Sequence, residues 1–204
     1  MFPLCVLRHL ATEALALVEL TQIVDLVCSK APWCRREIFE STLALALEVA
    51  REGREGRRVG ALVTLGAADM VMASSRPLIL NPLSGHVPAA THITDRRLRG
   101  TMKELAQLDG AFVVADDGTV VAACRYLDAR AEDIEVPMGL GSRHVAAAAA
   151  VSRLRHVVAI VVSRRGVVCV FCHGELCTEF TIGGDSLRRN DGPGASTAAG
   201  HDFR

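Results

Sequence analysis

A short polar stretch with the sequence GLGSRH, residues 139–144, stands directly before an alanine run at residues 146–150. The alanine run is typical of a helix, so the polar stretch would form the helix N-terminus. Such an end offers unpaired backbone N–H groups and the positive end of the helix dipole. A hydroxyl, a guanidinium and an imidazole beside it would complete a phosphate-binding site. The alternative is a serine N-cap with two exposed polar residues. The candidate residues are Gly141, Ser142, Arg143 and His144.

A second stretch with possible chemistry is Asp109-Gly110-Ala111, which falls where a predicted helix ends and a predicted strand begins. A carboxylate at a strand entry, followed by two residues with almost no side chain, leaves room for a ligand to approach the backbone. The alternative is a turn aspartate that hydrogen-bonds its own backbone. Taken alone, this motif leaves both interpretations open.

Together the two motifs resemble the diadenylate cyclase domain family, which includes the nucleotide-binding domain of the DNA integrity scanning protein. The signatures of that family are Asp-Gly-Ala and Gly-(Thr/Ser)-Arg-His-Arg. They stand here at 109–111 and 141–144, in the same order and the same strand context. The resemblance covers roughly residues 55–183. The loop at residues 76–86 is also similar to that of archaeal-type or stand-alone members.

The resemblance implies that two ATP molecules condense to cyclic di-AMP with release of two pyrophosphates. Each domain would supply half of the site, so two protomers of a homo-oligomer would meet face to face. Asp109 would hold Mg²⁺ or Mn²⁺ and help to activate the 3′-hydroxyl. The phosphates would be gripped at the helix N-terminus. Its residues would be Gly141, Ser142, Arg143 and His144, with Gly110 and Ala111 letting the nucleotide lie close to the strand.

One residue departs from the family pattern: Val145 stands where the second arginine of the signature is expected. The alternative function is therefore a catalytically weak or inactive module that binds the nucleotide or cyclic di-AMP. Arg76, His86 and Arg125 are candidates to replace the missing guanidinium. The DNA-binding region of the integrity scanning protein is not evident, so DNA scanning is not expected.

The elements that must position these residues begin with two helices, at residues 4–29 and 35–53, which form a helical N-terminal extension over 1–55. A strand at 59–65, a short helix at 67–75 and a helix at 95–107 capped by Asp95 follow. A hairpin covers 111–127 with its turn at 116–119, and a helix covers 142–155. Three consecutive strands lie between residues 156 and 182.

These elements predict an α/β fold with a mixed central sheet flanked by helices, because hairpins occur beside strand–helix–strand crossovers. The nucleotide-binding domain would span residues 56–183. The tail at residues 184–204 lacks periodicity and is rich in Gly, Ser and Asp, so we expect it to be disordered.

Composition limits the remaining possibilities. The 23 basic side chains balance the 23 acidic ones, which argues against bulk binding to nucleic acid. The most apolar stretch, near residues 10–31, carries three acidic residues, so no membrane span and a cytoplasmic protein are expected. Of the seven cysteines, Cys169 and Cys172 form a C-x-x-C pattern on a predicted strand. Residues three apart on a strand face opposite sides, which favours buried structural cysteines over a zinc or redox site.

Overall fold

A computed structural model describes residues 18–52, 59–128, 147–149, 151–183 and 186–189. A helix over residues 18–30 is followed by α2 (Arg36–Glu52). The chain continues through β1 (Ala61–Gly66), α3 (Ala68–Ala73), β2 (Ser75–Pro77), the 3-10 turn η1 (Pro88–Ala90), α4 (Arg96–Leu105), β3 (Ala111–Ala115) and β4 (Val120–Leu127). Helical residues 147–149 and 151–152 lead into β5 (Val157–Val162), β6 (Val167–Cys172), β7 (Glu175–Gly183) and β8 (Ser186–Arg189).

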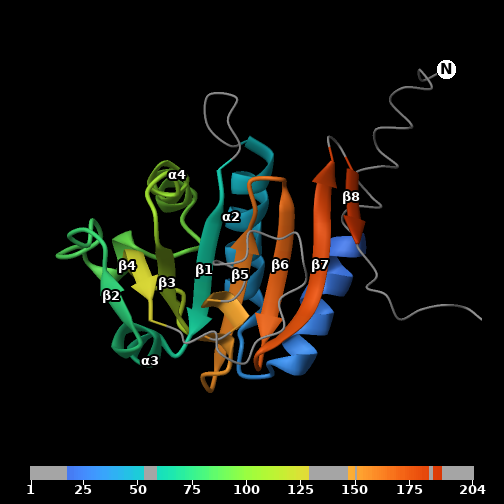
Figure 1. The fold of residues 1–204 in the computed structure, drawn as a ribbon, viewed down its shortest axis with the longest axis horizontal. Helices are drawn as coiled ribbons and strands as arrows, with labels where there is room; N and C mark the ends of the chain where they lie inside the picture. The colour runs from blue at the N-terminus through green and yellow to red at the C-terminus, as the bar shows by residue number, and fades with distance from the viewer. Residues whose placement is uncertain (1–17, 53–58, 129–146, 150, 184–185, 190–204) are drawn as a thin grey trace, which may run out of the picture.

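The described strands form one sheet in the order β2-β4-β3-β1-β5-β6-β7-β8 (Figure 1). The β1–β3 pair is parallel, with Leu62 opposite Ala111, and every other neighbouring pair of described strands is antiparallel. The parallel pair arises from the long crossover through α3, β2 and α4, whereas the other pairs include simple hairpins. The prediction of an α/β fold with a mixed sheet flanked by helices is therefore confirmed.

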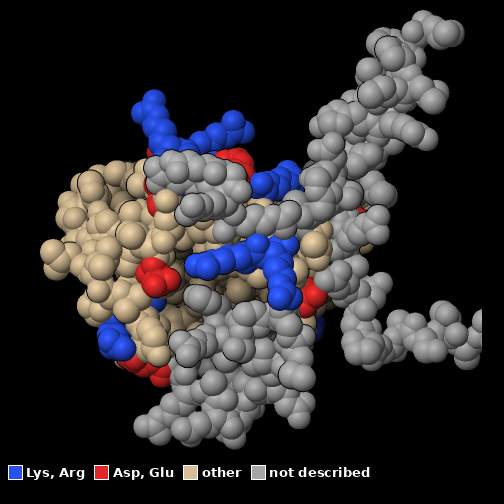
Figure 2. All heavy atoms as spheres, turned by 45° about the horizontal axis from the view of Figure 1, so that its top comes forward, with Lys and Arg blue, Asp and Glu red and all other residues tan. Residues whose placement is uncertain are grey.

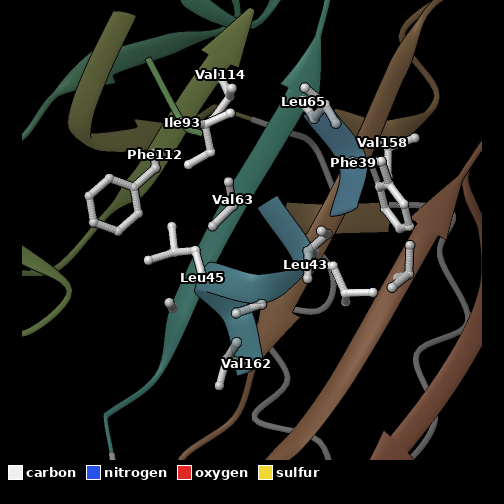
Figure 3. Packing of buried hydrophobic residues seen from close by; sticks show 14 of the residues in the cluster. Phe39, Leu43, Leu45, Val63, Leu65, Ile93, Phe112, Val114, Val158 and Val162 are labelled. Carbon is white, nitrogen blue, oxygen red and sulfur yellow. The ribbon is translucent and has the colours of Figure 1, made fainter. Parts of the chain in front are cut away.

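Alternating side chains divide the sheet into two covered faces. One face packs against the helix of residues 18–30, α2 and α4, and its core is continuous from α4 to β7. In Figure 3 the side chains of Phe39, Leu43 and Leu45 on α2 point toward Val63 on β1 and Val158 on β5. We call this the α2 face. Because α2 contributes so many buried residues to it, the N-terminal helices complete the core of the sheet.

The opposite face is covered by α3 and by helical residues 147–149 and 151–152, and we call it the α3 face. Ala148, Ala149 and Val151 from that helix pack in one cluster with Ala111 of β3 and Val161 of β5. The alanines are fully buried there, which agrees with a helix that lies close to the sheet.

Local signals explain the elements that lead to β3. The carboxylate of Asp95 accepts a hydrogen bond from the Arg97 backbone N–H at 2.8 Å and caps α4, as the sequence predicted. The β3–β4 turn is closed by Asp117, whose carboxylate accepts from the Thr119 N–H at 2.8 Å. That bond stabilises the charged form and lowers the pKa of Asp117.

The C-terminal prediction is wrong for residues 186–189. The structure places them in β8, which pairs with β7 from Phe180↔Arg189 to Gly183↔Ser186, so the tail expected to be disordered adds an edge strand. Backbone pairing at a sheet edge requires no apolar side chains. The polar composition of this segment therefore gave no sign of a strand. The other residues of 184–204 lie outside the described residues, as do residues 4–17 of the predicted first helix.

Figure 2 shows basic and acidic side chains next to one another on the face that carries α4. Lys103 on α4 contacts Glu52 at 2.7 Å and Glu48 at 3.4 Å, which ties α4 to α2. Within the described part of the chain, no helix has both the length and the apolar character that crossing a bilayer requires.

Candidate functional site

Asp109 lies in the short connection between α4 and β3, with its side chain exposed. Ala111, two residues later, is buried on the α3 face and pairs with Arg125 of β4. Because β3 and β4 are antiparallel, the start of β3 and the end of β4 lie at the same end of the sheet, which we call the Asp109 end. None of the residues that the structure describes forms a hydrogen bond or ion pair with the Asp109 carboxylate.

Gly110 is held in a conformation that only glycine adopts readily. Its φ is +111°, and a Cβ at this position would lie 2.6 Å from the backbone carbon of Cys124 and 2.8 Å from the Arg125 nitrogen. Both neighbours are main-chain atoms of β4, which cannot move aside as a side chain can. The glycine therefore allows β3 to enter the sheet in contact with β4, and Asp109 is fixed one residue before this contact.

The contact arises from an irregularity in β4. The register moves from Ala111↔Arg125 to Val113↔Ala122, so β4 carries one extra residue, and Cys124 has a positive φ of 56°. This is a β-bulge, which bends the strand and changes the direction of its side chains. Ala123 and Cys124, although adjacent, both pack on the α2 face. Burial raises the pKa of the Cys124 thiol, which is consistent with a packed rather than a reactive cysteine.

Arg125 follows the bulge and fixes the neighbouring elements. Its guanidinium donates to the Ser75 hydroxyl at 3.0 Å, to the Ser75 carbonyl at 2.6 Å and to the Met72 carbonyl at 3.1 Å. These acceptors lie at the end of α3 and the start of β2. Arg125 therefore joins α3 to the strand that pairs with Ala111, and its Nε and Nη2 atoms donate within the fold.

The sequence analysis missed both the bulge and this role of Arg125. The available signal was the run Ala122-Ala123-Cys124, which interrupts the alternation expected of a strand with two different faces. Arg125 was proposed as a phosphate ligand because it is close to the motif in sequence. The structure shows that its hydrogen bonds are made within the fold.

The structure places Asp109, Gly110 and Ala111 together at the Asp109 end. The second motif, Gly141, Ser142, Arg143 and His144, and the neighbouring Val145 lie outside the described residues. The meeting of the two motifs therefore remains a prediction.

The structure also places the two other candidates, Arg76 and His86, and the nearby His92. Arg76 lies 4.5 Å from the centre of the Tyr126 ring and 3.4 Å from the Asp128 carboxylate. His86 is exposed in the loop after β2. His92 bridges the Thr94 hydroxyl at 2.7 Å and the Asp117 carbonyl at 2.9 Å, so it secures the β3–β4 turn.

The expectation for the C-x-x-C pattern is confirmed in its geometry. Cys172 packs on the α2 face and Cys169 on the α3 face, so the two thiols lie on opposite sides of β6. Among the described residues, no group of three or more His, Cys, Asp or Glu side chains is arranged to hold a metal ion. The two thiols of this pattern therefore cannot bind one metal ion together.

With this geometry in place, comparison with known proteins identifies the family. The family model described as DisA bacterial checkpoint controller nucleotide-binding, abbreviated DAC, matches residues 48–176, more than half of the chain. The chain belongs to the DAC family. The matched region contains both motifs and all strands from β1 to β6.

Two relatives are named diadenylate cyclase. The one from Methanocaldococcus jannaschii is 42% identical over 71% of this chain and 46% of its own length. The one from Haloferax volcanii is 40% identical over 73% of this chain and 53% of its own length. The present DAC chain thus spans about half the length of these curated relatives.

Solved structures are similar at lower identity. A crystal structure of DacA from Staphylococcus aureus matches with a TM-score of 0.45 and 19% identity, over 74% of this chain and 85% of that one. A hypothetical membrane spanning protein from Bacillus cereus matches with a TM-score of 0.46 and 23% identity, over 66% of this chain and 59% of that one.

Proposed function

We propose that this DAC chain is a diadenylate cyclase, which condenses two ATP molecules into cyclic di-AMP and two pyrophosphates at a site shared by two protomers. The name of the two archaeal relatives supports this activity. The observation that carries the proposal is the exposed Asp109 carboxylate, fixed beside the rigid contact between Gly110 and the β4 bulge. A reacting group in that position is one residue from the point where β3 is fixed against β4.

The described residues around Asp109 support its meeting with the second motif. Asp128, after the end of β4, lies at the Asp109 end, and its N–H donates to the Ser74 carbonyl at 2.9 Å. The helix that resumes at residue 147 packs on the α3 face, in the same cluster as Ala111. The described residues before and after positions 129–146 thus both contact elements next to the Asp109 motif. We infer that the segment between them brings Ser142, Arg143 and His144 to the phosphates.

The chemistry follows from these residues. The 3′-hydroxyl oxygen of one nucleotide attacks the α-phosphorus of the other, the bond to pyrophosphate breaks, and the hydroxyl proton passes to the Asp109 carboxylate. Arg143, His144 and the backbone N–H groups of the helix N-terminus balance the negative charge on the phosphate oxygens. Catalysis of this kind depends mainly on positioning and charge neutralisation.

A divalent cation fits the residues that are present. Mg²⁺ in phosphoryl-transfer sites is typically held by one or two carboxylates together with substrate phosphates and water, and Asp109 offers one exposed carboxylate. Bound there, Mg²⁺ or Mn²⁺ would supply charge stabilisation to the phosphate oxygens and lower the pKa of the attacking hydroxyl.

A second copy of the chain is required because each protomer holds one ATP. Cyclic di-AMP contains two phosphodiester bonds, and each is formed between nucleotides held by different protomers. Two copies facing one another would place each 3′-hydroxyl opposite the α-phosphorus of the other nucleotide. We therefore propose a homo-oligomer in which the Asp109 ends of two protomers meet.

The test is incubation of the purified chain with ATP and Mn²⁺ or Mg²⁺, followed by chromatography and mass detection of cyclic di-AMP. Asp109→Asn removes the negative charge and should abolish product formation. Asp116→Asn is the matched control, because Asp116 is also an exposed aspartate but lies in the turn between β3 and β4. Product from Asp109→Asn at the wild-type rate would refute the role of Asp109.

The alternative function is a module that binds nucleotide without turnover, and Val145 is the observation that favours it. A charge-assisted hydrogen bond contributes about 1.5–3 kcal/mol. Isothermal titration with ATP and with cyclic di-AMP distinguishes the two functions. Binding without product from the folded chain, in the presence of either metal, would establish the binding module and exclude the cyclase.

A further inference from the structure

The hairpin of β6 and β7, distant in the chain from Asp109, contains an irregularity of its own. Val170 pairs with Thr178 and Phe171 pairs with Leu176, so Cys177 has no partner in the register. This is a second β-bulge, because a step of one residue along β6 corresponds to a step of two residues along β7. Cys177 therefore stands opposite the step between Val170 and Phe171, less than two residues along the hairpin from the level of Cys172.

The bulge brings two thiols together. Cys172, the last residue of β6, is 2% exposed and belongs to the core of the α2 face, and the half-buried Cys177 packs against the same core. Cys172 pairs with Glu175 in the register, and Cys177 stands two residues beyond Glu175 on the same face, so the two cysteines are diagonal neighbours across the hairpin. Two cysteines from opposite strands of one hairpin thus present their sulfur atoms to each other.

The environment gives the two thiols different reactivity. A hydrogen bond from Cys172 lowers the pKa of Cys177, and the positive charge of Lys30 acts in the same direction. The same hydrogen bond, together with burial, raises the pKa of Cys172. Cys177, which is also the more exposed of the two, is therefore the thiol that reacts first.

The hairpin is held in place on both sides. The Nε2 atom of His173, in the turn, lies 3.0 Å from the Lys30 carbonyl at the end of the first described helix. The backbone N–H of Gly174 donates to the Ser152 hydroxyl at 3.0 Å, on the other face of the sheet. The thiols are consequently presented by a fixed turn, as a bond between them requires.

We propose that Cys172 and Cys177 form an oxidisable pair that closes to a disulfide when a peroxide reaches Cys177. The Cys177 thiolate attacks one peroxide oxygen, the O–O bond breaks, and Cys177 becomes a sulfenic acid while one water is released. The Cys172 thiol then attacks the Cys177 sulfur, which forms the S–S bond and releases a second water. Two thiols are oxidised and one hydrogen peroxide is reduced to two waters.

The test is treatment of the reduced, folded chain with hydrogen peroxide, followed by alkylation of the remaining thiols and cleavage after glutamate without reductant. Cleavage after Glu175 separates the peptide that carries Cys172 from the one that carries Cys177. We expect the two peptides to remain linked, with the loss of two hydrogen atoms, and to separate when a reductant is added.

Two variants make the assignment specific. Cys177→Ser should abolish the link. Cys169→Ala should preserve the link. Cys169 is the other cysteine of β6 and faces the α3 side, so a link that survives its removal identifies Cys172 as the partner. The proposal is overturned if Cys177 accumulates as sulfinic acid while Cys172 is alkylated. It is equally overturned if the Cys177 peptide is linked to Cys28 or Cys34 instead.

Discussion

The contact between Gly110 and the β4 bulge predicts the result of a three-glycine series. Gly110 combines a φ of +111° with main-chain atoms of Cys124 only 2.6 Å from the position of a Cβ. Gly85 has a φ of +84° but no atom within 4 Å of that position. Gly100, inside α4, has free space around its Cβ position and no unusual φ. Alanine at these three positions separates the cost of the backbone conformation from the cost of the close approach.

The expected magnitudes follow from these environments. Gly100→Ala should stabilise the fold by up to about 1 kcal/mol, because alanine is the better helix former. Gly85→Ala should lower the free energy of unfolding by about 1–2 kcal/mol, because alanine disfavours the left-handed conformation. The lower entropy of the unfolded alanine chain offsets about 0.4–1 kcal/mol of this cost. Gly110→Ala adds an overpacking cost of about 1–3 kcal/mol to the same conformational cost. Its total should therefore exceed that of Gly85→Ala by at least 1 kcal/mol.

Urea unfolding followed by circular dichroism measures all three values, provided that the m-value stays constant across the series. A Gly110→Ala variant no less stable than Gly85→Ala would refute the reasoning, since β4 would then be able to move away from the added methyl group. The glycine of the Asp-Gly-Ala motif would in that case be explained by the approach of a ligand alone.

Three further predictions test separate parts of the molecule. Arg125→Lys should lower the free energy of unfolding by about 1–3 kcal/mol, because a lysine cannot reproduce the three hydrogen bonds to Ser75 and Met72; an unchanged urea midpoint would contradict it. The lowered pKa of Asp117 means that its charged form stabilises the fold above about pH 4 and that this contribution is lost as the pH falls. The stability difference between wild type and Asp117→Asn should thus shrink toward pH 2, and a constant difference would exclude the Thr119 N–H as its cause. Val145→Arg should raise kcat/KM for cyclic di-AMP formation by about 10- to 150-fold if the added guanidinium acts in the transition state, and equal rates would show that it does not.

Much of the fold could be predicted because its signals are local. The Asp95 cap of α4 and the Asp-Asp-Gly-Thr turn between β3 and β4 are read from adjacent residues, and the buried strands are short runs of apolar residues. β8 could not be predicted in this way. It depends on the backbone of β7, and its own composition resembles that of a tail.

In the candidate site, too, features that depend on adjacent residues were predicted and features that depend on a second strand were not. Asp109 was found because a carboxylate before two small residues at a strand entry is visible in the sequence. The reason for Gly110 was not visible, because it depends on the positive φ of Cys124 in another strand. A bulge is a property of a pair of strands, so neither strand predicts it alone. The Cys177 bulge, which places two thiols together, was missed for the same reason.

The structure also limits which group could replace the guanidinium absent at Val145. Arg125 lies on the α3 face, but its Nε and Nη2 atoms are bonded to α3 and β2, and releasing them would leave half-buried acceptors unpaired. Arg76 is exposed and its ion pair with Asp128 is weak enough to break, but it stands over Tyr126. Tyr126 is adjacent to Arg125 on β4, so side-chain alternation places Arg76 on the α2 face, away from Ala111 and from helical residues 147–149 and 151–152. Of the two arginine candidates, Arg125 is hydrogen-bonded within the fold and Arg76 faces away. A cyclase built from this chain would therefore rely on Arg143 alone among these arginines, which is why restoring arginine at 145 is the substitution that separates a slow enzyme from a binding module.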